Sequence, residues 1–163
     1  MDILAERINH YYNDPNGSVK EQWMNCSYFN RMSCRASADF LFPYISGLNI
    51  CSLKELGSEK LENMAKTEHK RWNAFHFSMG YSTMNQKIWE QRAREYLEEK
   101  SEKGASKLRI SKDTENMLHA CLISWDELDG LSAREQKVTG HNIDYKQMDR
   151  DNVRTVIELL ETN

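Results

Sequence analysis

Two tryptophans lie in surroundings that could recognise a flat, anionic ligand. Trp72 follows Glu68, His69 and Arg71 within one helical segment, and Trp125 follows a predicted strand. An indole face can stack on a purine or another flat ring, while an arginine or a helix N-terminus can receive a phosphate. The alternative is that both indoles are core side chains, because a large aromatic at a helical apolar position usually packs inside. The residues alone leave both interpretations open.

Patterns for metal binding and catalysis are weaker. His69 and His76 are seven residues apart on one predicted helix, and Glu62 lies seven residues before His69, so all three are near one face. No third ligand has a compelling spacing, which favours ordinary polar helix residues. We therefore predict no metal, no cofactor and no catalytic residues. One enzymatic hypothesis stays open beside this prediction, a hydrolase of a nucleotide derivative that acts through His69 and Glu68.

Composition limits the function classes further. The chain has 163 residues, with 22 Lys and Arg against 25 Asp and Glu, so its formal charge is 22 − 25 = −3. Its isoelectric point is near 6.0, which disfavours a protein that coats nucleic acid. Its seven glycines are all isolated. Phosphate-cradling loops need clustered glycines, so the common nucleotide-enzyme fingerprints are missing.

The cysteines and the apolar segments indicate a cytoplasmic protein. The four cysteines show no short metal or redox spacing, and we expect them to be reduced and mostly buried. His119 and Cys121 are too close in sequence for a standard thiol and imidazole couple, so a buried thiol beside a structural histidine is favoured. Residues 40–50 are too short and too polar for a membrane span. We expect no secretory signal, no membrane contact and no nucleic-acid partner.

Apolar spacing predicts a mainly α-helical domain with a minor sheet. In the N-terminal part it predicts three helices. The first covers 3–12, the second begins at Ser18 with a Ser18-x-x-Glu21 capping box, and the third is capped by Ser33 and kinked at Pro43. A turn is expected at 13–17, and a long helix over 59–79 that ends at Gly80.

The C-terminal part predicts a solvated helix over 85–103 and short strands at 107–111 and 121–124. A second capping box, Ser132-x-x-Glu135, predicts a short helix closed by Gly140. A terminal helix is expected to start near Asp149, with Val153, Val156, Ile157 and Leu160 on its apolar face.

Six blocks of this sequence, in order, resemble the RyR domain, the module repeated in the ryanodine-receptor calcium channels and also found in prokaryotic and phage proteins. The blocks are Glu68-His69-Lys70-Arg71-Trp72, Gly80-Tyr81, Lys112-Asp113, His119-Ala120-Cys121-Leu122, Ser124-Trp125-Asp126-Glu127-Leu128 and Asp149-Arg150-Asp151-Asn152-Val153-Arg154. The match as a whole covers residues 59–160. No single block is specific, and the resemblance rests on all six.

The chain also departs from the family pattern. Ala120 replaces the usual proline, which leaves that turn less constrained. Residues 85–109 look like a charged helical insertion that could cover or extend a ligand pocket. Trp23 and the segment Arg35-Ala36-Ser37-Ala38-Asp39 resemble the second half of a unit. Residues 1–58 are therefore a possible half-repeat that packs on an RyR-like domain at 59–163.

The resemblance implies paired antiparallel helices with a few short strands and a non-enzymatic role in sensing a nucleotide-derived ligand. Fold-level analogy is only an associational argument for function. We expect Trp72 and Trp125 to stack on the base and Arg150 and Arg154 to meet phosphate. The remaining candidate ligand-binding residues are Glu68, His69, Arg71, Tyr81, His119 and Arg35. The alternative is a protein-interaction or homo-oligomerisation module without a small ligand.

Overall fold

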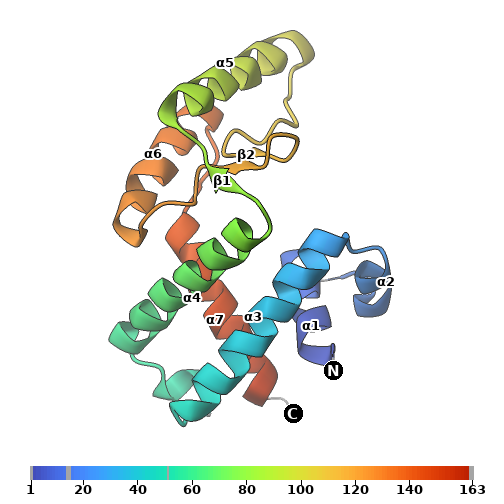
Figure 1. Cartoon of the computed structure of the whole chain (residues 1–163), viewed down its shortest axis with the longest axis vertical. Helices are drawn as coiled ribbons and strands as arrows, with labels where there is room; N and C mark the ends of the chain where they lie inside the picture. The colour runs from blue at the N-terminus through green and yellow to red at the C-terminus, as the bar shows by residue number, and fades with distance from the viewer. Residues whose placement is uncertain (1, 14–15, 51, 162–163) are drawn as a thin grey trace. The chain divides into compact units, whose positions relative to one another are not determined.

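The computed structural model describes residues 2–13, 16–50 and 52–161, which are mainly helical. The helices are α1 (Ile3–Tyr12), α2 (Val19–Met24), α3 (Tyr28–Gly47), α4 (Ser58–Ser78), α5 (Gln86–Lys103), α6 (Leu128–Thr139) and α7 (Tyr145–Glu161) (Figure 1). Two short 3-10 helices cover Leu53–Glu55 and Trp125–Glu127, and the strands are β1 (Ser82–Thr83), β2 (Lys112–Asp113) and β3 (Leu118–His119). The predicted class, mainly α with a few short strands, is confirmed.

The chain forms two compact units. Unit 1 comprises residues 1–75 and 148–163, and unit 2 comprises residues 76–147. The division falls inside two helices, after Phe75 in α4 and after Gln147 in α7. The boundary that the family resemblance draws near residue 58 concerns repeat units, and it stays a prediction.

Unit 1 is built around an apolar core supplied by helices from both ends of the chain. Residue pairs that contact across α1 and α3 place these two helices side by side (Figure 1). The side chains of Ile8, Leu41, Ile45, Val156 and Ile157 are almost completely buried in this core. The predicted apolar face of the last helix is confirmed, because Val153, Val156 and Ile157 are buried and Leu160 packs against this core.

Helix α3 begins earlier than its apolar pattern indicates. The Ser27 hydroxyl accepts the Asn30 N–H and caps the helix, so the predicted cap Ser33 lies inside it. The helix then continues through Pro43 to Gly47. Ser18 does cap α2, by accepting the Glu21 N–H. Of the predicted turn at 13–17, Asp14 and Pro15 lie outside the described residues.

Unit 2 combines α5 and α6 with a three-stranded sheet in the order β1-β3-β2. β1 is parallel to β3, and β2 pairs with β3 in antiparallel fashion. The strands lie at 112–113 and 118–119, so the predicted positions 107–111 and 121–124 are wrong. Gly80 has φ of +88°, a left-handed conformation that glycine adopts without strain. It ends α4 and turns the chain into β1, as predicted.

Helix α5 is not the solvated helix that its charge predicts. Its bounds are correct, but Trp89, Ala93 and Tyr96 are buried, and together they form an apolar face that packs within unit 2. Their spacing of four and three residues places them on one side of the helix. This face of α5 is therefore part of the core of unit 2.

The second predicted capping box lies inside a helix. The reciprocal hydrogen bonds of a capping box join Ser124 and Glu127, ahead of α6, whereas Ser132 and Glu135 are buried within α6. Gly140 closes α6 in the left-handed conformation, as predicted. The last helix starts at Tyr145, before the predicted Asp149, because Asp144 accepts the Gln147 N–H at 2.9 Å.

The buried face of α5 predicts a stability difference between adjacent residues. Tyr96→Ala is expected to lower the free energy of unfolding by about 3 kcal/mol, since it removes a buried aromatic side chain. Leu97→Ala, at a position that is 47% exposed, is the matched control and should change it by less than about 0.5 kcal/mol. Urea unfolding followed by circular dichroism measures both, and equal effects would contradict the packing of α5.

Candidate functional site

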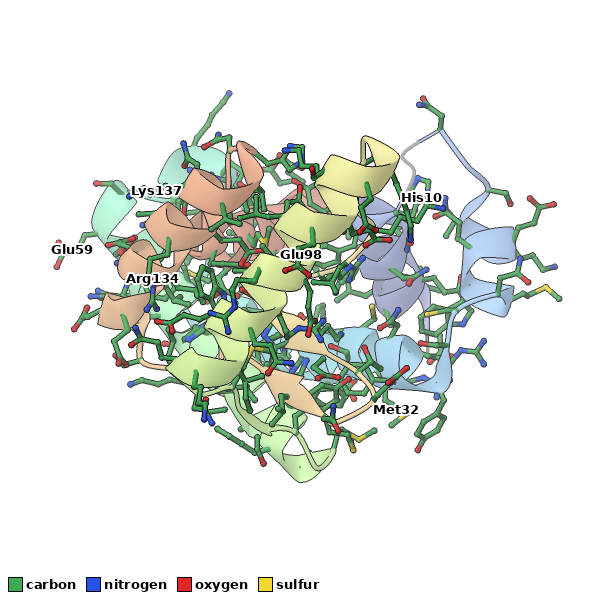
Figure 2. All side chains as sticks on the ribbon, turned by 90° about the horizontal axis from the view of Figure 1, so that it is seen from above. His10, Met32, Glu59, Glu98, Arg134 and Lys137 are labelled. Carbon is green, nitrogen blue, oxygen red and sulfur yellow. The ribbon has the colours of Figure 1, made fainter. Side chains whose placement is uncertain are left out.

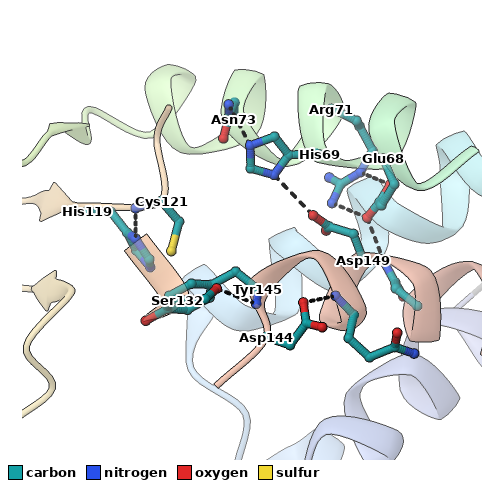
Figure 3. Close-up of polar contacts among 12 residues, drawn as sticks. Glu68, His69, Arg71, Asn73, His119, Cys121, Ser132, Asp144, Tyr145 and Asp149 are labelled. Atoms are coloured by element: carbon teal, nitrogen blue, oxygen red, sulfur yellow. Dashed lines mark hydrogen bonds and ion pairs between the residues drawn. The ribbon is translucent and has the colours of Figure 1, made fainter. Parts of the chain in front are cut away.

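Glu68 is a buried carboxylate in α4 that binds three side chains of unit 1, and Figure 3 shows its contact with Arg71. The Arg71 guanidinium donates from Nε to Oε2 at 2.7 Å and from Nη2 to Oε1 at 2.8 Å. Asn152 donates to Oε1 at 2.6 Å, and the Ser37 hydroxyl donates to the same oxygen at 3.2 Å. Two predicted site residues, Glu68 and Arg71, therefore bind each other inside the protein.

Burial and the neighbouring charge act in opposite directions on the pKa of Glu68, and two buried polar atoms of its partners make no hydrogen bond in the described part of the chain. Burial raises the pKa of Glu68, while the hydrogen bonds and charge of Arg71 oppose that rise. Taking a carboxylate and a guanidinium out of water costs several kcal/mol per ion, which only a well-bonded pair offsets. In the described part of the chain, Nη1 of Arg71 and Oδ1 of Asn152 are buried without a hydrogen-bond partner.

His69 is fixed on both sides of its ring. Its Nδ1 lies 3.1 Å from Oδ2 of Asp149, and the Asn73 amide lies 3.3 Å from Nε2 (Figure 3). The Trp72 indole stacks on the imidazole, with the ring centroids 6.2 Å apart. Burial raises the pKa of Asp149, and the hydrogen bond from His69 opposes the rise. Glu68 and His69, which the hydrolase hypothesis requires, are thus both bound to protein groups.

The four arginines among the predicted ligand-binding residues all lie in unit 1, and each is paired with a carboxylate. The pairs are Arg35 with Asp2 at 2.5 Å, Arg71 with Glu68 at 2.7 Å, Arg150 with Glu62 at 2.9 Å and Arg154 with Asp151 at 3.0 Å. A phosphate at any of them would have to compete with a carboxylate that is already in place.

Tyr81 and His119 lie in unit 2, beside the buried His76. The His76 ring meets the Tyr81 and His119 rings edge to face, at centroid distances of 5.2 and 5.6 Å. The Cys121 backbone N–H donates to Nδ1 of His119 at 3.2 Å (Figure 3). Burial, followed by the charge of His76, lowers the pKa of His119 to about 3. His119 is therefore a neutral acceptor at neutral pH.

Trp125 also lies in unit 2, whereas Trp72 lies in unit 1. The Trp125 side chain is 91% buried, because only 9% of its surface is exposed. The Lys146 ammonium lies 5.4 Å from its ring centroid and is held there by an ion pair with Asp129 at 2.6 Å. Both tryptophans proposed to stack on a ligand thus already contact a ring or a cation of the protein.

Sequence reasoning missed a second buried polar cluster, in unit 2. The carboxylate of Glu135 accepts the hydroxyls of Ser111 and Tyr145, the latter at 2.6 Å. Ser111 in turn accepts the indole N–H of Trp89 at 3.2 Å. The one available signal was the spacing of Trp89, Ala93 and Tyr96, which places an aromatic face within the charged helix.

A cleft of about 430 Å³ opens beside this cluster, between the start of α5 and α6. Trp89, Met84 and Leu131 give it apolar walls, while Asp126 and Arg134 bring opposite charges. The Arg134 guanidinium lies 5.5 Å from the Trp89 ring centroid. Arg134 and Lys137 are both exposed on α6 (Figure 2), but only Arg134 lines the cleft. None of the predicted site residues lines it.

Comparisons with family models, with curated proteins and with solved structures found no match. Among the described residues, no group of histidine, cysteine and acidic side chains is arranged to hold a metal ion. No helix in the same residues has the length and apolar character needed to cross a membrane. Cys26, Cys34 and Cys121 form no disulfide, and burial raises the pKa of the Cys34 thiol to about 12. Cys51 lies outside the described residues.

The buried ion pair predicts a characteristic double-mutant result. Glu68→Leu is expected to lower the free energy of unfolding by about 3–5 kcal/mol, because it leaves the Arg71 guanidinium buried without a counter-charge. The double variant Glu68→Leu/Arg71→Met removes both charges and should recover most of that loss. Urea unfolding of both variants checks this. A double variant no more stable than the single one would show that the charge pair is not the source of the effect.

The low pKa of His119 predicts a pH dependence of stability. The folded-state pKa of about 3 lies below the ordinary value of about 6.5, so the unfolded chain binds more protons between these values. The free energy of unfolding should therefore fall as the pH drops from about 6.5 towards 3, by up to about 1.4 kcal/mol per pH unit. His119→Gln does not titrate, and the difference between its pH profile and that of the wild type isolates this contribution. Parallel profiles would refute it.

Proposed function

We propose that this chain is a non-enzymatic binding module of the RyR type whose ligand is a small nucleotide-derived molecule. The observation that carries the proposal is the cleft of unit 2. Its volume of about 430 Å³ is within the range of small-molecule pockets. The resemblance to RyR domains supports the same class of function.

The lining of the cleft suits the separate parts of a nucleotide. Arg134 is an exposed cation that can meet a phosphate or another anionic group. Asp126 is an exposed carboxylate that makes no hydrogen bond or ion pair among the described residues, so it is available for a ribose diol. Met84, Ile123 and Leu131 offer apolar contact for a base.

The charge of the cleft restricts the ligand further. Asp126 and Glu127 bring two carboxylates against the single guanidinium of Arg134. The Glu127 carboxylate accepts the hydroxyl and the backbone N–H of Ser124, so it stays in place as a negative charge. Because like charges disfavour a polyphosphate, the cleft favours a nucleoside or a monophosphate over a triphosphate.

The insertion supplies part of this lining. Gln86 and Trp89 belong to α5, within residues 85–109, and both line the cleft. This position supports the proposal that residues 85–109 extend a ligand pocket. On this proposal the walls of the cleft contact the base, since Trp72 and Trp125 contact groups of the protein itself.

Calorimetric titration of the full chain tests the proposal. Adenosine and AMP are expected to bind, and ATP should bind roughly 10-fold more weakly than AMP because of the two carboxylates. Arg134→Ala should weaken the binding of AMP by roughly 10-fold or more and leave the binding of adenosine nearly unchanged, since it removes a charge-assisted contact to phosphate. Lys137→Ala is the matched control on α6 and should leave both unchanged. The absence of heat with all three compounds, or equal effects of the two variants, would overturn the proposal.

A protein-interaction or oligomerisation module is the second candidate function. An apolar groove in unit 1, lined by α1, α3 and the last turns of α7, favours it. This groove shares no residue with the cleft of unit 2.

A further inference from the structure

The groove of unit 1 has a volume of about 590 Å³ and an apolar floor. Its lining includes Leu4 from α1, Ala38 and Pro43 from α3, and Leu159 and Leu160 from α7. At its edges Ile3 is 66% exposed and Phe42 is 49% exposed. Single exposed apolar residues are ordinary on a protein surface, but two of them beside a continuous apolar groove mark a surface that gains from being covered.

Two charged side chains of opposite sign line the same groove. They are Arg7 on α1 and Asp39 on α3, and neither makes a hydrogen bond or an ion pair among the described residues. Arg7 differs in this respect from the other arginines of unit 1. Each of the others donates to a carboxylate or to backbone carbonyls, namely Arg31, Arg35, Arg71, Arg150 and Arg154.

This combination of charges selects among possible occupants. A fatty acyl chain with a carboxylate would match Arg7 and leave Asp39 beside a like charge. A two-fold symmetric interface matches both, because in such an interface residue i contacts residue j while j contacts i. Arg7 of each copy would then meet Asp39 of the other, and the exposed Ile3 and Phe42 would be covered. The patch is therefore complementary to itself in charge as well as apolar.

We propose that the groove of unit 1 is the contact surface of a symmetric homodimer, in which Arg7 and Asp39 form two reciprocal ion pairs between copies. The inference rests on the second candidate function and is independent of the cleft in unit 2. The exposed apolar edges drive the association, and the ion pairs fix its orientation and symmetry.

Light scattering coupled to size exclusion, over a roughly hundredfold range of protein concentration, tests the proposal on the full chain. The wild type should form a dimer as concentration rises. Arg7→Glu and Asp39→Arg should each be monomeric at the same concentration, because each variant brings like charges together twice. Their melting curves should stay close to that of the wild type, since neither side chain makes a hydrogen bond or an ion pair in the described part of the chain; Asp39→Arg also removes an electrostatic attraction to Arg35.

Mixing the two variants gives the decisive result. An equimolar mixture of Arg7→Glu and Asp39→Arg should recover a dimer, because in the mixed pair both contacts again join opposite charges. The double variant should recover one as well. A merely structural role of Arg7 or Asp39 would give no recovery on mixing, and that outcome would overturn the proposal.

The remaining outcomes separate this inference from the function on which it rests. A wild-type dimer that persists in both single variants would overturn the groove contact but retain oligomerisation through another surface. A wild type that is monomeric at every concentration would overturn both the groove contact and the oligomerisation function. A monomer whose melting temperature rises with decanoate would assign the groove to an acyl chain and would likewise overturn the dimer.

Discussion

A buried carboxylate needs hydrogen-bond donors from the surrounding protein, and in unit 1 the carboxylate with this need is Glu68. The donors come from three helices: Ser37 on α3, Arg71 on α4 and Asn152 on α7. The helices around Glu68 are therefore not interchangeable apolar rods, because a shift of any one would leave a buried charge without a partner. The apolar core of unit 1 supplies the driving force, and this cluster specifies the arrangement that satisfies it.

Unit 2 meets a similar requirement by different chemistry. Glu135 is also buried, but it receives hydroxyl groups from Ser111 and Tyr145 in place of a guanidinium. The cluster joins α6 to the segment before β2 and, through the Trp89 indole, to α5. Of these residues Trp89 also lines the cleft, so the packing that makes this face of α5 part of the core also shapes the surface on which the proposed ligand would lie.

Local patterns predicted the helices well and their caps unevenly. The first and fourth helices were correct because their apolar residues recur at steps of three and four. The cap of α3 was misplaced because its first turn is exposed and gives no periodic signal. Ser124-x-x-Glu127 and Ser132-x-x-Glu135 have the same spacing, and only tertiary contacts decide that the first caps a helix while the second points inward.

The candidate site was less predictable than the fold. Residue types in the blocks around Glu68 and Trp125 indicated which side chains were unusual, but not that their partners lay within the protein. The ion pairs of Arg35 with Asp2 and of Arg150 with Glu62 join residues that are far apart in sequence, and no local pattern encodes them. The cleft was harder still to foresee, because its walls come from segments that look like charged surface.

The cations that lie over the indole rings have a consequence for the solubility of the protein. Trp23 lies under Arg31 and Arg35, Trp89 under Arg134, and Trp125 under Lys146. The partly or fully exposed cations among them, Arg31, Arg35 and Arg134, keep hydration on the outer side while the inner side covers the aromatic face, whereas Lys146 is buried and paired with Asp129. The chain can thus hold large aromatic side chains close to its surface without exposing an apolar patch that favours aggregation. In a mildly acidic protein this arrangement also places positive charge where it shields rings and leaves many carboxylates facing the solvent.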